Sequence, residues 1–389
     1  MPWGETCAME ERLRFVADVL SGDETMTELC ELYGISRKTG YKWYARHCLE
    51  GVVGLQERSR APHEHGRARP VAMLEAVLEL KERWPLWGPR KVHAKLAALH
   101  PDWAVPAAST IGDWLCRHGK TQGRRRRRHC PPYTQPFAAA AAPNDVWAVD
   151  FKGWFRTGDR KRCDPLTASD ACSRYLLACQ AVRRADYDHT QPLFDALFCE
   201  FGLPRAIRSD NGPPFASVGA GGLSRLSVWW LKLGIRPERI APGKPQQNGR
   251  HERMHGTLKA ATAAPPAATL AAQQRRFNRF RREFNEERPH EALGQKPPAS
   301  LYRVSAKPYP CALREPTYDS DHAVRRVHTN GEIKWRGEFI FISEVLVGEP
   351  VGIAESAGGD WRVSFADVEL DFIDRRTFKI HRCPRARCA

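Results

Sequence analysis

Three acidic residues lie in sequence settings that are unusual for surface charges: Asp150, Asp210 and Glu252. Hard divalent cations such as Mg²⁺ take oxygen ligands and keep several waters, so a few carboxylates suffice to hold one or two ions. Two such ions can activate an attacking oxygen and stabilise a leaving oxygen at phosphorus. These acids therefore suggest a phosphoryl-transfer site. On spacing alone, the alternative stays open that Asp150 is a satisfied buried polar group and Glu252 a solvated helix residue.

Two of the acids are expected on strands. Asp150 follows the apolar run 146–149 and precedes Phe151, where a carboxylate without a partner would be costly to desolvate. Asp210 closes a short strand-like segment and is followed by the turn signal 211–214, which has the sequence Asn-Gly-Pro-Pro. This places Asp210 at the carboxyl end of a strand, where catalytic residues are common.

The third acid is expected on a helix. Glu252 follows a loop rich in glycine and proline and opens a helix predicted over residues 251–261. At helical spacing Glu252, His255 and Lys259 share a face. The sequence thus predicts an acid beside basic groups, on a face that could hold a metal and a phosphate together.

The segments around the acids resemble the integrase core of bacterial insertion-sequence transposases. The matching segments are Trp147-Ala148-Val149-Asp150-Phe151, Ser209-Asp210-Asn211-Gly212 with the Pro-Pro-Phe that follows, and the run from Pro245 to Lys259. The resemblance implies an RNase H-like fold and a catalytic triad of Asp150, Asp210 and Glu252 that also binds two Mg²⁺ ions, with Mn²⁺ as a substitute. Glu252 lies somewhat farther from Asp210 than is usual in the family, which fits a glycine-rich insertion at residues 216–222.

The family resemblance also implies an activity. Such an enzyme would bind the terminal inverted repeats of its own mobile element, cleave DNA at the 3′ ends and transfer the strands to target DNA. Because two ends must be cut together, a homodimer or larger assembly on double-stranded DNA is expected. Two alternatives remain open, an RNase H-like nuclease and a non-catalytic helix-turn-helix regulator.

The charge of the chain favours nucleic acid as its partner. The sequence holds 61 Lys and Arg against 45 Asp and Glu, a formal net charge of +16. The excess is clustered, and a basic cluster is suited to phosphate. One block consists of Arg124, Arg125, Arg126, Arg127 and Arg128. The proline and alanine residues that follow this block indicate a linker.

The amino-terminal region is predicted to contain two helix-turn-helix units. In the first, Ser36 follows a Gly-Ile turn and is expected to cap a basic helix. The residues of this helix suited to phosphate and base-edge contacts are Arg37, Lys38, Thr39, Lys42 and Arg46. A weaker copy occupies residues 90–99 and 107–118. Nearer the acids, Lys244, Asn248 and Lys259 are further candidates for DNA contact.

The full pattern predicts a multidomain protein: all-α helix-turn-helix units, a central α/β RNase H-like integrase core, and a carboxyl-terminal small β-barrel. A long charged helix is expected over residues 268–287, and short alternating segments from residue 323 onward indicate the β domain. The predicted boundaries are 1–60 and 61–122 for the helical units, 123–143 for the linker, 144–302 for the core, 303–322 for a second linker, 323–378 for the β domain and 379–389 for a basic tail.

Several other kinds of site are not indicated. The 12 cysteines form no Cys-x-x-Cys pair, so neither a zinc module nor a disulfide framework is predicted. Asp170 is interpreted as a structural acid at a strand turn. The sequence shows no signal peptide, transmembrane run or lipidation motif, so no membrane association is expected. A cytoplasmic location with the bacterial nucleoid is predicted.

Overall fold

The computed structural model describes residues 7–58, 70–121, 140–240, 249–356 and 358–381. The chain divides into two compact units, Met1–Arg69 and Pro70–Ala389. Within the described residues, no helix is long and apolar enough to cross a membrane.

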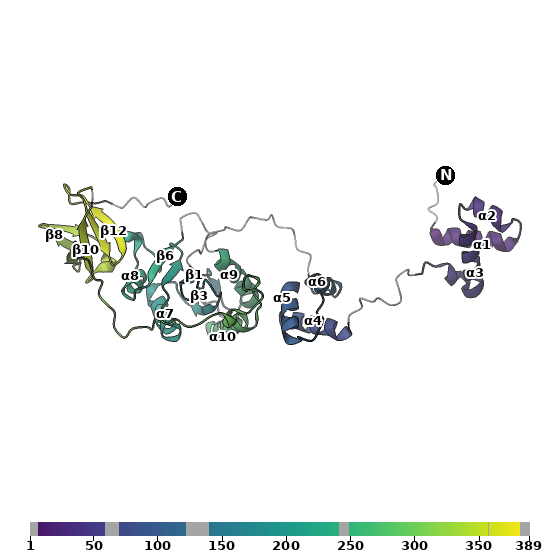
Figure 1. Cartoon of the computed structure of the whole chain (residues 1–389), viewed down its shortest axis with the longest axis horizontal. Helices are drawn as coiled ribbons and strands as arrows, with labels where there is room; N and C mark the ends of the chain where they lie inside the picture. Colours follow the sequence, from purple (N-terminus) through teal and green to yellow (C-terminus); the bar gives the residue numbers. More distant parts are fainter. Residues whose placement is uncertain (1–6, 59–69, 122–139, 241–248, 357, 382–389) are drawn as a thin grey trace. The chain divides into compact units, whose positions relative to one another are not determined.

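The first unit is a three-helix bundle that buries one small core (Figure 1). Its helices are α1 (Ala8–Ser21), α2 (Met26–Leu32) and α3 (Arg37–Glu50), followed by the 3-10 turn Gly51–Leu55. Ser36 caps α3 as predicted, since its side chain accepts a hydrogen bond from the backbone N–H of Thr39. Gly40 lets α3 approach the other helices closely, because a Cβ atom there would lie 2.5 Å from the Cys30 Sγ atom. The caps and the glycine together produce a helix-turn-helix arrangement.

The second unit begins with three more helices, α4 (Val71–Arg83), α5 (Pro89–Leu99) and α6 (Ala108–Arg117). Two tryptophans lie in their core, where Trp84 and Trp87 stack with ring centroids 4.2 Å apart. The other two, Trp103 and Trp114, pack against the same core. These four tryptophans are thus packing residues.

A mixed sheet forms the centre of the second unit. Its strands are β1 (Val146–Phe151), β2 (Phe155–Arg156), β3 (Arg162–Asp170), β4 (Leu176–Val182), β5 (Ala206–Ser209) and β6 (Arg236–Arg239). The order is β2-β3-β1-β5-β6, with β4 also paired to β3. Strand β1 runs antiparallel to β3 and parallel to β5. The carboxyl ends of β1 and β5 therefore meet at the same edge of the sheet.

Helices cover both faces of this sheet. Helices α7 (Tyr187–Phe201) and α8 (Arg225–Lys232) share one core with the residues of β1 and β3 that point to their side, including Trp147 and Leu166. Helices α9 (Gly249–Thr262) and α10 (Leu270–Arg282) pack on Cys163 and Cys179 of the other face. The predicted long helix ends in a π-helical turn, Glu283–Glu287. The central region is thus a mixed α/β layered domain, as expected for an integrase core.

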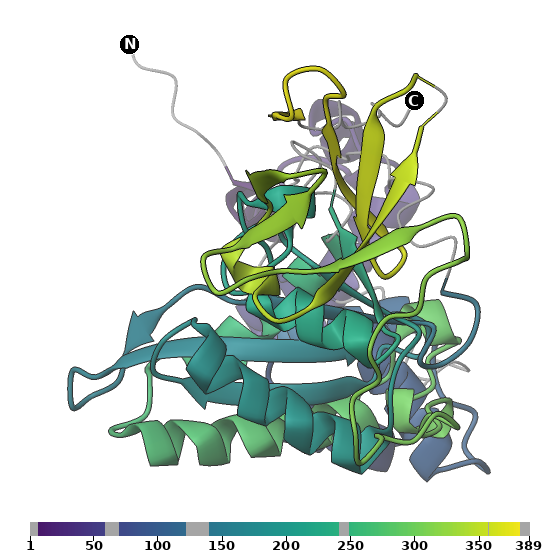
Figure 2. The same ribbon diagram turned by 90° about the vertical axis from the view of Figure 1, so that its left-hand side faces the viewer.

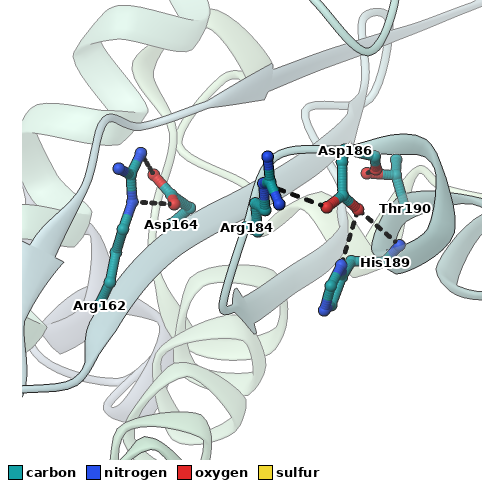
Figure 3. A network of polar contacts seen from close by, with 6 residues as sticks. All are labelled: Arg162, Asp164, Arg184, Asp186, His189 and Thr190. Carbon is teal, nitrogen blue, oxygen red and sulfur yellow. Dashed lines mark hydrogen bonds and ion pairs between the residues drawn. The ribbon is translucent and has the colours of Figure 1, made fainter.

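Polar contacts fix where α7 begins (Figure 3). The Asp186 side chain caps the helix by accepting a hydrogen bond from the backbone N–H of His189, and it also contacts the His189 ring at 2.7 Å. Arg184 lies 3.6 Å from the same carboxylate. These hydrogen bonds, the backbone one first, lower the pKa of Asp186. The cap is therefore a charged one that suits the positive end of the helix dipole.

The carboxyl-terminal region is antiparallel β structure, but the sheet is not shown closed into the predicted barrel. A five-stranded sheet has the order β13-β12-β11-β10-β7, and β8 pairs only with β9 in a separate hairpin. The strands are β7 (Ala323–Arg326), β8 (Glu332–Trp335), β9 (Glu338–Phe341), β10 (Pro350–Glu355), β11 (Trp361–Phe365), β12 (Val368–Ile373) and β13 (Ile380–His381).

Helix α8 belongs to two cores at once. Trp230 packs in the core of the central sheet, whereas Val228 packs with the carboxyl-terminal strands. Figure 2 shows the yellow-green strands beside the teal part of the chain. Lys232 adds a largely buried ion pair to Glu349, with 2.6 Å between Nζ and Oε1. In the glycine-rich insertion, Gly221 has a φ of +57° and lies against Leu370 of β12. The insertion thus contacts the β domain.

Candidate metal-binding active site

Asp150 lies near the end of β1, on the face covered by α9. Its side chain is 19% exposed, and it pairs in register with Thr167 of β3. Burial is the main cause that raises the pKa of Asp150 to about 7, and the negative charge of Asp210 is the second. Glu252 raises that pKa further, while the Phe151 backbone N–H and Lys152 oppose the rise. The charges of Asp210 and Glu252 therefore both act on Asp150.

Asp210 directly follows β5, as the turn signal predicted. Ala148 pairs with Arg208 in the parallel ladder, so continuing this register by two residues sets Asp150 beside Asp210. Burial raises the pKa of Asp210, and the Gly212 backbone N–H works against that rise. Among the described residues, the buried Asp210 Oδ1 atom has no hydrogen-bond partner. A buried carboxylate oxygen with an open lone pair is a suitable ligand atom for a cation.

Glu252 is exposed in the first turn of α9. Its carboxylate brings a third negative charge to the neighbourhood of Asp150. Three like charges gathered on separate elements repel one another unless a cation or protons compensate them. An all-oxygen set of this kind fits a hard divalent ion such as Mg²⁺. Asp150, Asp210 and Glu252 are thus the residues that would hold it.

Two buried histidines of α9 complete the surroundings of Asp150, and the sequence interpretation missed their role. His251 and His255 are 3% and 4% exposed. Both Nε2 atoms lie 2.7 Å from the Thr167 hydroxyl oxygen, and the His251 Nδ1 atom lies 3.1 Å from the Ser169 hydroxyl. Burial lowers the pKa of His251 to about 3 and that of His255 to about 2. The imidazoles are therefore neutral.

This arrangement corrects the predicted face of α9. His255 is buried against the sheet, whereas Glu252 and Lys259 are exposed. The reason is that the sheet face beneath α9 carries the hydroxyls of Thr167 and Ser169. The Thr167 hydroxyl forms a hydrogen bond with His255, and the Ser169 hydroxyl forms one with His251. Histidines spaced four residues apart beside strand hydroxyls are the signal that could have revealed this cluster.

Asp170 has a structural role, as predicted. Its carboxylate accepts hydrogen bonds from the Asn144 and Ser173 backbone N–H groups and from the Ser173 hydroxyl, all within 2.7 Å. These partners close the turn after β3. Since its oxygens are already engaged and it is 1% exposed, Asp170 is not placed to bind a metal.

The predicted DNA-contact residues fall into three groups. On α3, Arg37, Lys38 and Lys42 are exposed, and Lys42 lies 4.3 Å from the centre of the Trp43 ring. Also on α3, Arg46 is half-buried over Trp43, and Thr39 is half-buried and hydrogen-bonded to Ser36. On α9, Lys259 is exposed. The remaining ones, Arg124, Arg125, Arg126, Arg127, Arg128, Lys244 and Asn248, lie outside the described residues.

Removing the charge of Asp150 should stabilise the metal-free protein. Because the folded pKa of about 7 exceeds the unfolded value of about 3.9, the ionised carboxylate destabilises the fold, fully above pH 7 and not at all below about pH 4. In EDTA at pH 8, Asp150→Asn should raise the free energy of unfolding by about 1–3 kcal/mol. Thermal unfolding would measure this gain, and an equal gain at pH 4 would contradict the explanation. Added Mg²⁺ should stabilise only the wild type.

Comparison with known families agrees with this architecture. Integrase core domain models match residues 140–245 and 233–298. A helix-turn-helix domain model matches residues 11–63, and a homeodomain-like model matches residues 39–115. The fold and its acidic site therefore define a protein with an integrase core and amino-terminal helix-turn-helix domains.

Similar proteins come from mobile elements. "Insertion element IS476 uncharacterized 39.2 kDa protein" of Xanthomonas euvesicatoria is 30% identical over 59% of this chain and 64% of its own length, so the match spans less than two thirds of that relative. "Putative transposase for insertion sequence element IS5376" of Geobacillus stearothermophilus is 22% identical over 49% of this chain and 48% of its own length. A structure of the HTLV-2 integrase catalytic core domain in complex with magnesium is 17% identical, covering 42% of this chain and 99% of that one, with a TM-score of 0.34. The chain is thus similar to proteins of insertion elements and carries matches to the integrase core domain.

Proposed function

We propose that this chain binds the terminal inverted repeats of its mobile element and catalyses 3′-end cleavage and strand transfer, with Asp150, Asp210 and Glu252 as the catalytic residues. The observation that supports the proposal is that Asp150 of β1 lies where the charges of both Asp210, which follows β5, and Glu252 of α9 act on it. Two Mg²⁺ ions, or Mn²⁺ in their place, would supply activation of the attacking oxygen and stabilisation of the leaving oxygen.

The residues of the chain have defined tasks in this reaction. The three carboxylates would hold the cations where the scissile phosphate enters. First a water attacks the phosphodiester at the element end, and the bond between phosphorus and the element's 3′ oxygen breaks. The phosphate leaves on the 5′ end of the flanking strand, and the element keeps a free 3′-hydroxyl. That hydroxyl then attacks a phosphodiester of the target, forming one P–O bond as another breaks. Because bond number is conserved, the second step needs no ATP.

Joining of precleaved ends is the experiment that tests this function. Duplexes that end in the element's terminal sequence with a free 3′-hydroxyl are mixed with the full chain, Mg²⁺ and a supercoiled target plasmid. Covalent joining of the ends to the plasmid is expected. Cleavage without joining would show an RNase H-like nuclease instead, and binding without either reaction would show a regulator.

Binding and assembly belong to the same proposal. The helical units would read double-stranded DNA, and two or more copies would bring two ends together in the bacterial cytoplasm. The predicted domain boundaries, including 144–302 for the core, and the closure of the β domain into a small barrel are part of this proposal. The charge of +16 supports contact with phosphate.

Exposed basic residues on α3 should control the affinity for DNA. Replacing Arg37 and Lys42 together with Ala is expected to weaken binding of the element ends and to reduce the slope of log K against log salt by about 1 for each phosphate that the variant no longer neutralises. Filter binding at several salt concentrations would measure this. Arg14→Ala on α1 is the matched control, because Arg14 is also exposed and pairs with Glu11 at 3.6 Å. Equal losses of affinity for both variants would argue against α3 as the DNA-reading helix.

A further inference from the structure

The hydroxyl of Thr167 determines the protonation of the histidine cluster. This oxygen lies 3.1 Å from the Asp150 backbone carbonyl oxygen and 2.7 Å from each of the two Nε2 atoms of His251 and His255. A hydroxyl has one proton to donate, and a carbonyl oxygen can only accept. All three contacts are hydrogen bonds at the same time only if Thr167 donates to Asp150 and both Nε2 atoms carry protons.

Because both Nε2 atoms carry the ring proton, each Nδ1 atom is left as a hydrogen-bond acceptor. A neutral imidazole with a proton on Nε2 has a lone pair on Nδ1. At His251 this lone pair is used, because the Ser169 hydroxyl lies 3.1 Å away and can donate to it. Both ring nitrogens of His251 are therefore satisfied by hydroxyls, and His251 has no lone pair left for a metal.

His255 differs from His251 in what its Nδ1 atom faces. That atom lies 3.8 Å from the Asp150 Oδ2 atom. This distance is too long for a hydrogen bond, so a proton does not join the two atoms. Atoms that each bind one ion at about 2.1 Å can be as much as about 4.2 Å apart, so a shared cation fits between them. His255 is also 96% buried, as its 4% exposure shows, and desolvation favours a partner for its lone pair.

We infer that the Nδ1 atom of His255 is a nitrogen ligand of the divalent cation held by Asp150. The inference rests on the proposed metal site and goes beyond its three carboxylates. A nitrogen ligand suits Mn²⁺ and other transition ions better than Mg²⁺, which prefers oxygen. The preference of this site for Mn²⁺ over Mg²⁺ should therefore be stronger than that of an all-oxygen site.

Pulsed electron paramagnetic resonance of Mn²⁺ bound to the full chain tests this directly. The wild-type spectrum is expected to show coupling to an imidazole ¹⁴N nucleus, and protein grown with ¹⁵N-histidine should replace that signal with ¹⁵N coupling. The isotope comparison needs no substitution, so it stands even if a variant fails to fold. Bound Mn²⁺ without nitrogen coupling would overturn the inference and leave the carboxylate site intact.

Two matched substitutions assign the nitrogen to one ring. In His255→Gln, the amide N–H can take the place of Nε2–H toward Thr167, but the amide nitrogen offers no lone pair to a cation. The ¹⁴N coupling should vanish and the Kd for Mn²⁺ should rise by about tenfold or more, at least the effect of losing an outer-shell partner. His251→Gln keeps the same Thr167 contact and should retain the coupling. Persistence of the coupling in His255→Gln would refute the assignment, whereas failure of Mn²⁺ to bind more tightly to wild type than to Asp150→Asn would refute the proposed metal site itself.

Discussion

Strand transfer should fall by about 10³-fold or more when Asp150 is replaced by Asn or Glu252 by Gln, because each change removes a carboxylate charge of the proposed cation site. The loss is expected in both Mg²⁺ and Mn²⁺. Binding of the element ends should be nearly unchanged, since the proposed DNA-reading residues of α3 belong to the other compact unit. Joining of precleaved ends, measured beside a gel-shift assay, separates the two effects.

The control for this experiment is an acid that lies away from the proposed site. Asp188 is exposed in the first turn of α7 and pairs with neither Asp150 nor Asp210 in the described contacts. Asp188→Asn should join ends at the wild-type rate. If Asp150→Asn or Glu252→Gln also joined ends at that rate, the catalytic assignment would be wrong.

Local sequence signals predicted much of the fold. Ser36 was identified as a helix cap because a small hydroxyl residue before a basic helix satisfies its free backbone N–H groups. Asp150 was placed on a strand because its neighbours are apolar and suited to a sheet. These signals act over a few residues, so they can be read without knowing what lies across the fold.

Long-range pairing explains what local signals missed. The contacts of Thr167 with His251 and His255 join residues 84 and 88 positions apart, so the helix alone could not show which face meets the sheet. The two-sided packing of α8 depends in the same way on the distant strands that bury Val228. Apolar residues on both sides of that short helix were the available signal.

The start and end of the core are tied together by Asn144, and its loss should destabilise the fold strongly. Its Oδ1 atom accepts hydrogen bonds from the Trp147 ring N–H at 3.0 Å and the Tyr302 hydroxyl at 2.9 Å. Its Nδ2 atom donates to the Arg303 carbonyl oxygen. Asn144→Ala leaves two buried donors unpaired, each costing about 1–3 kcal/mol. A total loss of about 3–5 kcal/mol in the free energy of unfolding is expected.

Backbone strain and side-chain loss can be separated at this position. Asn144 has a φ of +67°, which asparagine tolerates and alanine does not. Asn144→Gly should therefore be about 1 kcal/mol less destabilising than Asn144→Ala, although both lose the same hydrogen bonds.

Tyr302→Phe removes one donor but leaves Oδ1 bonded to Trp147, so its cost should be smaller than that of Asn144→Ala. In denaturant unfolding, the double variant Asn144→Ala, Tyr302→Phe should then lose less than the sum of the single losses. Full additivity would mean that the two side chains do not share this hydrogen bond in solution.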